Sequence, residues 1–251
     1  TLLILLIMSG FLGVIGSGPL VRFPRILVAN TPTGGDMGAH VLLPQVLRDV
    51  LLPSGRIFGW SSTWYAGFPA LYFYFPIPAL TTVLLDVVLP YGVAFKLVTV
   101  VGLVALPVAT YGFVRLLGFS RSVSGLAALT GSMFVFMESF SIFGANIKST
   151  LAGEFSFSWS FALSILYLGI ISRDTRLGRR FSPLAGVVLA LTALTHIVTT
   201  MIVVTVSVAM LFRRNGPRTV ISSWVLGFAL SAFWALPFAV RFLQGMATPF
   251  R

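Results

Sequence analysis

The sequence contains no cysteine, which excludes disulfide bridges and thiolate metal sites. Charge is also scarce, because only 9% of the 251 residues are Asp, Glu, Lys or Arg, whereas a soluble domain carries about 25%. A chain this poor in charge cannot cover a water-facing surface, and 57% of its residues are hydrophobic. The composition therefore predicts an integral membrane protein. The apolar runs are continuous rather than alternating, which favours helices over a membrane β-barrel.

Acidic residues are few: six Asp and Glu stand against 17 Lys and Arg, which gives a net charge of +11. The arginines gather between apolar runs, as in loops that orient membrane helices by the positive-inside rule. We therefore expect no nucleic-acid partner, and we expect these loops on the cytoplasmic side of a plasma (inner) membrane. The clusters are Arg115 and Arg121; Arg173, Arg176, Arg179 and Arg180; and Arg213, Arg214 and Arg218.

Five apolar runs approach or exceed the roughly 20 residues that cross a hydrocarbon core as a helix. A long, mostly polar segment follows the first run, and its residues 39–52 carry an apolar stripe typical of a helix on the membrane surface. The sequence thus predicts an all-α, polytopic transmembrane bundle with a long outer loop bearing juxtamembrane helices after the first span. Residues 1–251 are expected to form a single membrane domain, the N-terminal part of a longer protein. The five runs are residues 2–18, 93–117, 122–140, 155–172 and 220–240.

Two further apolar stretches each admit two interpretations. Residues 68–90, which are interrupted by prolines and contain Asp86, form either a kinked full span or a re-entrant or juxtamembrane element. The second is favoured, because a crossing would put the next arginines on the wrong side. Residues 182–212 lie between two basic clusters, which favours a hairpin of two short helices meeting near His196 over one long tilted helix.

Ionisable groups inside a membrane protein are costly and indicate function by default. Asp36 follows Gly34 and Gly35, and it either caps the helix that follows or faces a cavity that the glycines let a ligand approach. If the helix begins near Asp36, His40 lies one turn later on the same face. His196 interrupts an apolar run, where it either bonds to a neighbouring helix or stands at the tip of the hairpin.

A second polar cluster lies between two predicted spans. It runs from Asn146 through Lys148 to Glu154, and the alternative interpretation is an ordinary solvated connection. Aromatic residues also gather in the long outer loop, where they either anchor the chain at the membrane interface or stack against sugar rings. These aromatic residues are Trp60, Trp64, Tyr65, Tyr72 and Tyr74.

The order of elements resembles the glycosyltransferase C superfamily, whose members have an acidic residue in a long outer loop after the first span and a second one in the next outer loop. Asp36 matches the first acid and Glu154 the second. Four strings, at residues 34–40, 64–69, 89–96 and 149–155, also resemble large actinobacterial membrane proteins named for a relation to 6-pyruvoyl-tetrahydropterin synthase. The resemblance runs from about Leu2 to Val240, and no pterin chemistry is visible in it.

The resemblance implies a membrane enzyme that moves a sugar from a polyprenyl-phosphate donor to a glycan or lipid acceptor of the cell envelope, on the outer face. Asp36 would be the general base, and Glu154 and His196 would orient the acceptor. Alternatively, Asp36 and Glu154 would hold a divalent cation such as Mg²⁺ or Mn²⁺. The expected substrate-binding residues are His40, Trp64, Tyr65, Asn146 and Lys148, and the lipid phosphate would meet Lys148, Arg22, Arg25 or Arg56.

The same residues are also compatible with two other functions. The chain could be a non-catalytic membrane subunit that binds a lipid or its headgroup, together with other membrane subunits. It could also be a transporter, since helices broken at mid-membrane, as proposed at His196, are a transporter feature.

Overall fold

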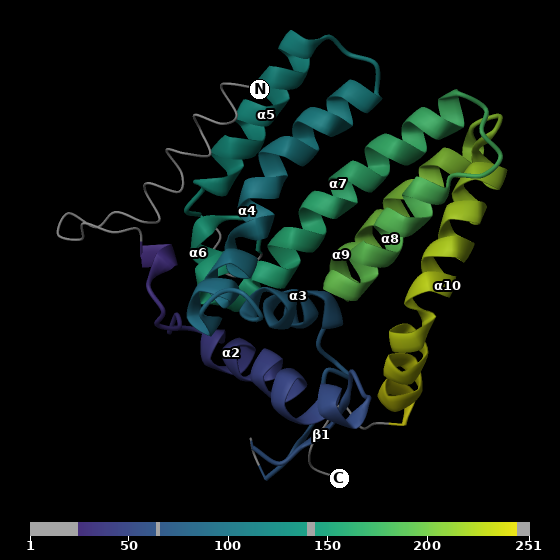
Figure 1. Ribbon diagram of the computed structural model, residues 1–251. Coiled ribbons are helices and arrows are strands. Elements are labelled where there is room, and N and C mark those ends of the chain that lie inside the picture. Colours follow the sequence, from purple (N-terminus) through teal and green to yellow (C-terminus); the bar gives the residue numbers. More distant parts are fainter. Residues whose placement is uncertain (1–24, 64–65, 140–143, 245–251) are drawn as a thin grey trace.

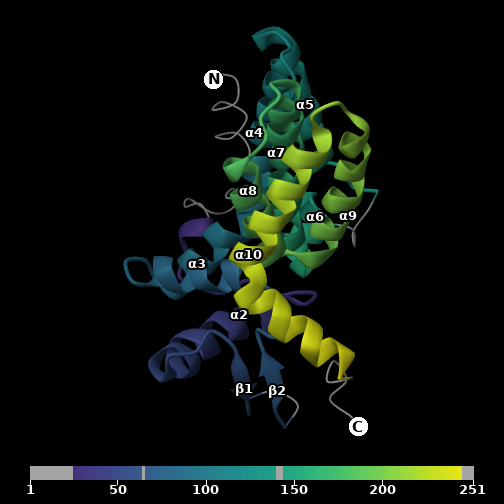
Figure 2. The same cartoon turned by 90° about the vertical axis from the view of Figure 1, so that its right-hand side faces the viewer.

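The computed structural model describes residues 25–63, 66–139 and 144–244. The predicted first span at residues 2–18 lies outside these residues, as do Trp64 and Tyr65. Helices form a row in the order α5, α4, α7, α8 and α10, and α9 packs beside α7 (Figures 1 and 2). Their bounds are α4 Tyr91–Leu116, α5 Arg121–Val135, α7 Phe155–Arg176, α8 Pro183–Thr195, α9 Ile197–Val208 and α10 Gly216–Leu243.

Three helices in the described part of the chain, α4, α7 and α10, are long and apolar enough to cross a membrane. Much of their apolar surface is uncovered. Only 33% of the most apolar stretch of α10 is buried, and Val225, Phe228 and Phe233 are among its exposed side chains. An apolar surface this continuous is unstable in water, so the structure agrees with the predicted helical membrane protein.

The stretch at residues 182–212 folds as the predicted hairpin. His196 has extended backbone angles (φ −165°, ψ 125°) and separates α8 from α9. Near the tip, the Ser160 hydroxyl of α7 donates to the Thr192 carbonyl at 2.9 Å and also pairs with Thr199. Towards the far end of α7, the Ser172 hydroxyl meets the sulfur of Met210. The two helices therefore run in opposite directions along α7.

The three arginine clusters lie at the same end of the bundle, at the top of Figure 1. Arg176, at the end of α7, donates to the carbonyls of Leu116 and Leu117, at the end of α4. Asp174 is buried there and accepts a hydrogen bond from the Ser182 hydroxyl at 2.7 Å. Asp174 therefore has a structural role, and the arrangement agrees with the predicted clustering of basic loops on one side.

A juxtamembrane layer covers the other end of the bundle (Figures 1 and 2). The predicted surface helix at residues 39–52 is α2 (Met37–Val46), which continues through the turns η2 (Leu47–Leu51) and η3 (Leu52–Ser54). Leu43 and Leu47 of this helix pack against Leu71 and Ala79. The layer is tied to α10 by Trp234, whose indole N–H donates to the Leu71 carbonyl at 3.0 Å.

Helix α3 (Pro76–Asp86) decides how residues 68–90 are built. Its 11 residues rise about 16 Å, about half of the roughly 30 Å hydrocarbon core, so it is too short to be a full span. Asp86 at its end accepts a hydrogen bond from Arg48 at 2.5 Å, which pairs α3 with the surface helix. The juxtamembrane interpretation therefore fits the structure.

Two local features differ from the sequence prediction. Helix α5 ends at Val135 rather than at residue 140, because the N–H groups of Phe136 and Met137 close a final turn before Glu138 turns away to pair with Lys148. A small antiparallel sheet was also not expected in the all-α prediction. Its strands, β1 (Gly59–Ser61) and β2 (Phe68–Ala70), are three residues long, too short to show an alternating pattern.

Candidate functional site

Asp36 is held against the segment that precedes α7. Its backbone N–H donates to the Ala152 carbonyl at 2.8 Å. This approach requires glycine at the preceding position, because a Cβ on Gly35 would lie 2.1 Å from the Ala152 oxygen and Gly35 has a φ of +50°. The glycine lets the chain approach the Ala152 backbone closely, whereas the sequence prediction concerned the approach of a ligand.

Gly153 makes the second close approach, from the other side of the same junction. Its φ is +129°, and a Cβ there would lie 3.0 Å from the Asp36 Cβ and 3.4 Å from the His40 Cδ2. Glu154 follows immediately, and its charge interacts with that of Asp36. The structure thus brings together Asp36, His40 and Glu154, three residues that the sequence selected from two different loops.

The Asp36 carboxylate does not cap α2. Asp36 precedes the helix, but its side chain accepts no hydrogen bond from the first turn, so the capping interpretation is wrong. Asp36 is exposed, whereas Glu154 is half-buried at the start of α7. Two carboxylates of different exposure therefore lie within electrostatic reach of each other at the end of the bundle that carries the juxtamembrane layer.

His40 lies in an aromatic setting next to these acids. Its ring makes edge contacts with Tyr74 and Phe155, at centroid distances of 5.5 and 5.0 Å. Burial lowers the pKa of His40 to about 4, and the nearby Asp36 charge opposes this shift only in part. The imidazole is therefore neutral at physiological pH and can accept or donate a hydrogen bond without adding positive charge.

Tyr74 belongs to the site, although the sequence placed it only in the aromatic group of the outer loop. Burial raises the pKa of its phenol, and the charges of Asp36 and Glu154 raise it further. The phenol thus lies within electrostatic reach of both acids. Nothing in its local sequence indicated this, because the contact depends on how α3 packs under the bundle.

His196 stands beside this group, within electrostatic reach of His40. Its ring packs on Phe75 at 4.5 Å and on Phe157 at 5.3 Å. Within the described residues, its buried Nδ1 atom has no hydrogen-bond partner. The ring therefore lies among aromatic side chains, and no direct bond links it to Asp36 or Glu154 within that part of the chain.

The remaining candidate residues are used locally. Asn146 is buried, and its side-chain oxygen accepts hydrogen bonds from the N–H and the hydroxyl of Ser149. Lys148 forms an exposed ion pair with Glu138 at 2.9 Å. Arg56 is exposed beyond η3. Arg22 lies outside the described residues, as does the side chain of Arg25.

The donor set does not by itself form a metal cage. No group of three or more His, Asp, Glu or Cys side chains that could hold a metal ion occurs within residues 25–63, 66–139 and 144–244. A divalent cation would have Asp36 and Glu154 as its protein carboxylates and would take its other ligands from water or substrate.

No protein-family model, curated protein or solved structure matches this chain.

Proposed function

We propose that this chain is a membrane glycosyltransferase that moves a sugar from a polyprenyl-phosphate donor to a cell-envelope acceptor. The observation that supports this proposal best is the pairing of Asp36 with Glu154 through the Ala152 carbonyl and Gly153. An exposed carboxylate beside a partly buried one provides two acids in different environments, and such pairs take different roles in acid–base chemistry.

In this reaction the Asp36 carboxylate takes the proton of an acceptor hydroxyl. The acceptor oxygen then bonds to the anomeric carbon of the sugar, the bond from that carbon to the phosphate oxygen breaks, and polyprenyl phosphate leaves with the bonding electrons. Glu154 orients the acceptor through hydrogen bonds to its hydroxyl groups. Tyr74 and neutral His40 supply further hydrogen bonds and an aromatic face for the sugar ring.

The proposal also assigns a side. The basic loops mark the cytoplasmic face by the positive-inside rule, and the starts of α2 and α7, which follow Asp36 and Glu154, lie at the opposite end of the bundle. The protein would then be a multi-pass protein of the plasma membrane with an extracytoplasmic site, where lipid-linked sugars are available and nucleotide sugars are not.

The test uses the full chain in proteoliposomes. Radiolabelled polyprenyl-phosphate hexoses and pentoses are supplied in turn as donors, with isolated cell-envelope membranes as acceptors. Asp36→Asn should lose nearly all transfer without a change in thermal stability. Asp49→Asn is the matched control, since Asp49 is exposed in η2, which continues from α2, and pairs with its neighbour Arg48 at 2.7 Å. Equal transfer by the Asp36→Asn variant and the parent would exclude Asp36 as the base.

A further inference from the structure

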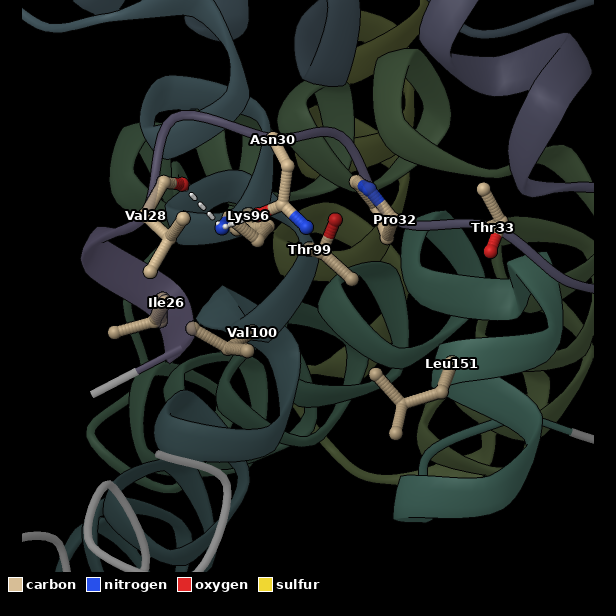
Figure 3. Close-up of a pocket in the computed structure, with 9 residues that line it drawn as sticks. All are labelled: Ile26, Val28, Asn30, Pro32, Thr33, Lys96, Thr99, Val100 and Leu151. Carbon is tan, nitrogen blue, oxygen red and sulfur yellow. Dashed lines mark hydrogen bonds between the residues drawn. The ribbon is translucent and has the colours of Figure 1, made fainter. Parts of the chain in front are cut away.

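A cavity of about 500 Å³ is lined in part by the segment that leads to Asp36 (Figure 3). Its wall includes Thr33, three residues before Asp36, and Leu151, next to the Ala152 carbonyl that binds the Asp36 N–H. The segments that carry Asp36 and Glu154 therefore also line this cavity. Its volume is in the range of small-ligand sites, roughly 300–1,000 Å³.

The polar groups of this cavity gather around one lysine. The ammonium of Lys96, on α4, donates to the Val28 carbonyl at 2.5 Å and to the Asn30 side-chain oxygen at 3.1 Å. Figure 3 shows the polar ends of Asn30, Lys96 and Thr99 in the middle of the lining. This arrangement suits an anion with several oxygen atoms.

The rest of the lining is mostly apolar, and one of its residues also lines a longer groove. Val100 lines the cavity together with Ile26 and Val28, and it also lines an apolar groove of about 690 Å³ between α4 and α7. That groove extends along α4 from Leu97 to Gly112. The rise over this stretch is about 22 Å, most of the roughly 30 Å thickness of a hydrocarbon core.

We infer that Lys96 and Asn30 bind the phosphate of a polyprenyl phosphate lipid, and that its chain lies in the groove between α4 and α7. A charged pocket that shares Val100 with a long apolar groove matches an amphiphile with one anionic head, whereas a free phosphate would need no groove. The inference rests on the proposed function for the identity of the lipid. It assigns to Lys96, in place of Lys148, the neutralisation of the leaving phosphate.

Binding of a radiolabelled polyprenyl monophosphate to the full chain in phosphatidylcholine nanodiscs tests the headgroup site. Lys96→Gln should weaken binding about 10- to 100-fold, the effect of losing a hydrogen bond to a charged group, and Lys96→Arg should restore most of it. Lys148→Gln is the matched control and should bind like the parent. Unlabelled neutral polyprenol should compete poorly, and inorganic phosphate should not compete at the same concentration.

Filling the groove tests where the lipid chain lies. Val108 lines the groove and is 48% exposed, so Val108→Trp should reduce polyprenyl phosphate binding without unfolding the protein. Leu126→Trp, on the exposed face of α5, is the control and should have no effect. Unchanged binding by Val108→Trp would contradict the placement of the lipid chain in the groove. The groove would then have another apolar occupant, such as a second copy of this chain.

Three outcomes overturn the inference as a whole. Parent-like binding by Lys96→Gln would show that Lys96 does not hold the phosphate. Displacement by inorganic phosphate would show that the site binds a free anion. Equal competition by polyprenol would show that the phosphate headgroup contributes nothing to binding. The proposed function fails separately: Asp36→Asn should still bind the lipid, so continued sugar transfer by Asp36→Asn would exclude the Asp36 base while leaving the Lys96 site intact.

Discussion

Gly153 offers a way to separate the two acids without removing either of them. At its φ of +129°, a residue with a Cβ is strained, and such strain costs about 1–3 kcal/mol. The added Cβ would also lie 3.0 Å from the Asp36 Cβ, so Asp36 must shift by a few tenths of an ångström. Since a misplacement of about 1 Å can cost about 100-fold in rate, a shift of a few tenths of an ångström should lower sugar transfer by Gly153→Ala about 3- to 10-fold.

Gly118→Ala is the matched control for this change. Gly118 also has a positive φ, of +97°, but a Cβ there would meet only the Arg176 side chain at 3.6 Å, an ordinary contact at the basic end. Both variants should lose thermal stability, and only Gly153→Ala should lose transfer per folded molecule in the proteoliposome assay. Transfer by Gly153→Ala at the rate of Gly118→Ala would refute the view that the Gly153 contact positions Asp36.

Three other predictions follow from the structure. The free energy of unfolding should fall by at most about 3 kcal/mol as the pH drops from 6.5 to about 4. Burial lowers the pKa of His40 to about 4, so the unfolded chain binds the proton at a higher pH than the folded chain does. In chemical denaturation, the stability of His40→Gln should depend less on pH than that of the parent. Trp234→Ala should lower the free energy of unfolding by about 3–5 kcal/mol, because the indole is 1% exposed and donates a hydrogen bond to the Leu71 carbonyl. Trp234→Phe keeps most of the packing and should lose less stability; an equal drop in melting temperature for both variants would contradict the contribution of packing. Single cysteines introduced at Ser120 and Asn215 should react with a membrane-impermeant maleimide from one side of the membrane, and a cysteine introduced at Ser62 should react from the other side. Labelling of all three from the same side would contradict the fold. The sequence contains no other cysteine that would react.

The sequence predicted the bundle well where a long apolar run decided the structure. The runs at residues 93–117, 155–172 and 220–240 became α4, α7 and α10 with shifts of a few residues at their ends. The arginine clusters correctly indicated the hairpin at residues 182–212, because charge is excluded from the hydrocarbon core whatever the details of packing.

The candidate site was predictable only in part. Scarcity of acids singled out Asp36 and Glu154, since few other ionisable groups stood near apolar runs. Their proximity depends on two glycines and on the backbone hydrogen bond from Asp36 to Ala152, which are 116 residues apart in the sequence. No local sequence pattern indicates such a contact. For the same reason the sequence did not place Tyr74 beside the two acids or assign a role to Lys96, because an aromatic residue in a loop and a lysine near a helix start are each ordinary by themselves.

The most direct test of the account is transfer of radiolabelled sugar from polyprenyl-phosphate hexoses and pentoses to envelope membranes, measured with the parent chain and with Asp36→Asn in proteoliposomes of equal protein content. The account predicts transfer with at least one donor by the parent, and a loss of at least about 100-fold in Asp36→Asn, within the range that a positioned general base contributes. Transfer by Asp36→Asn at the parental rate, in protein that melts at the parental temperature, would contradict it.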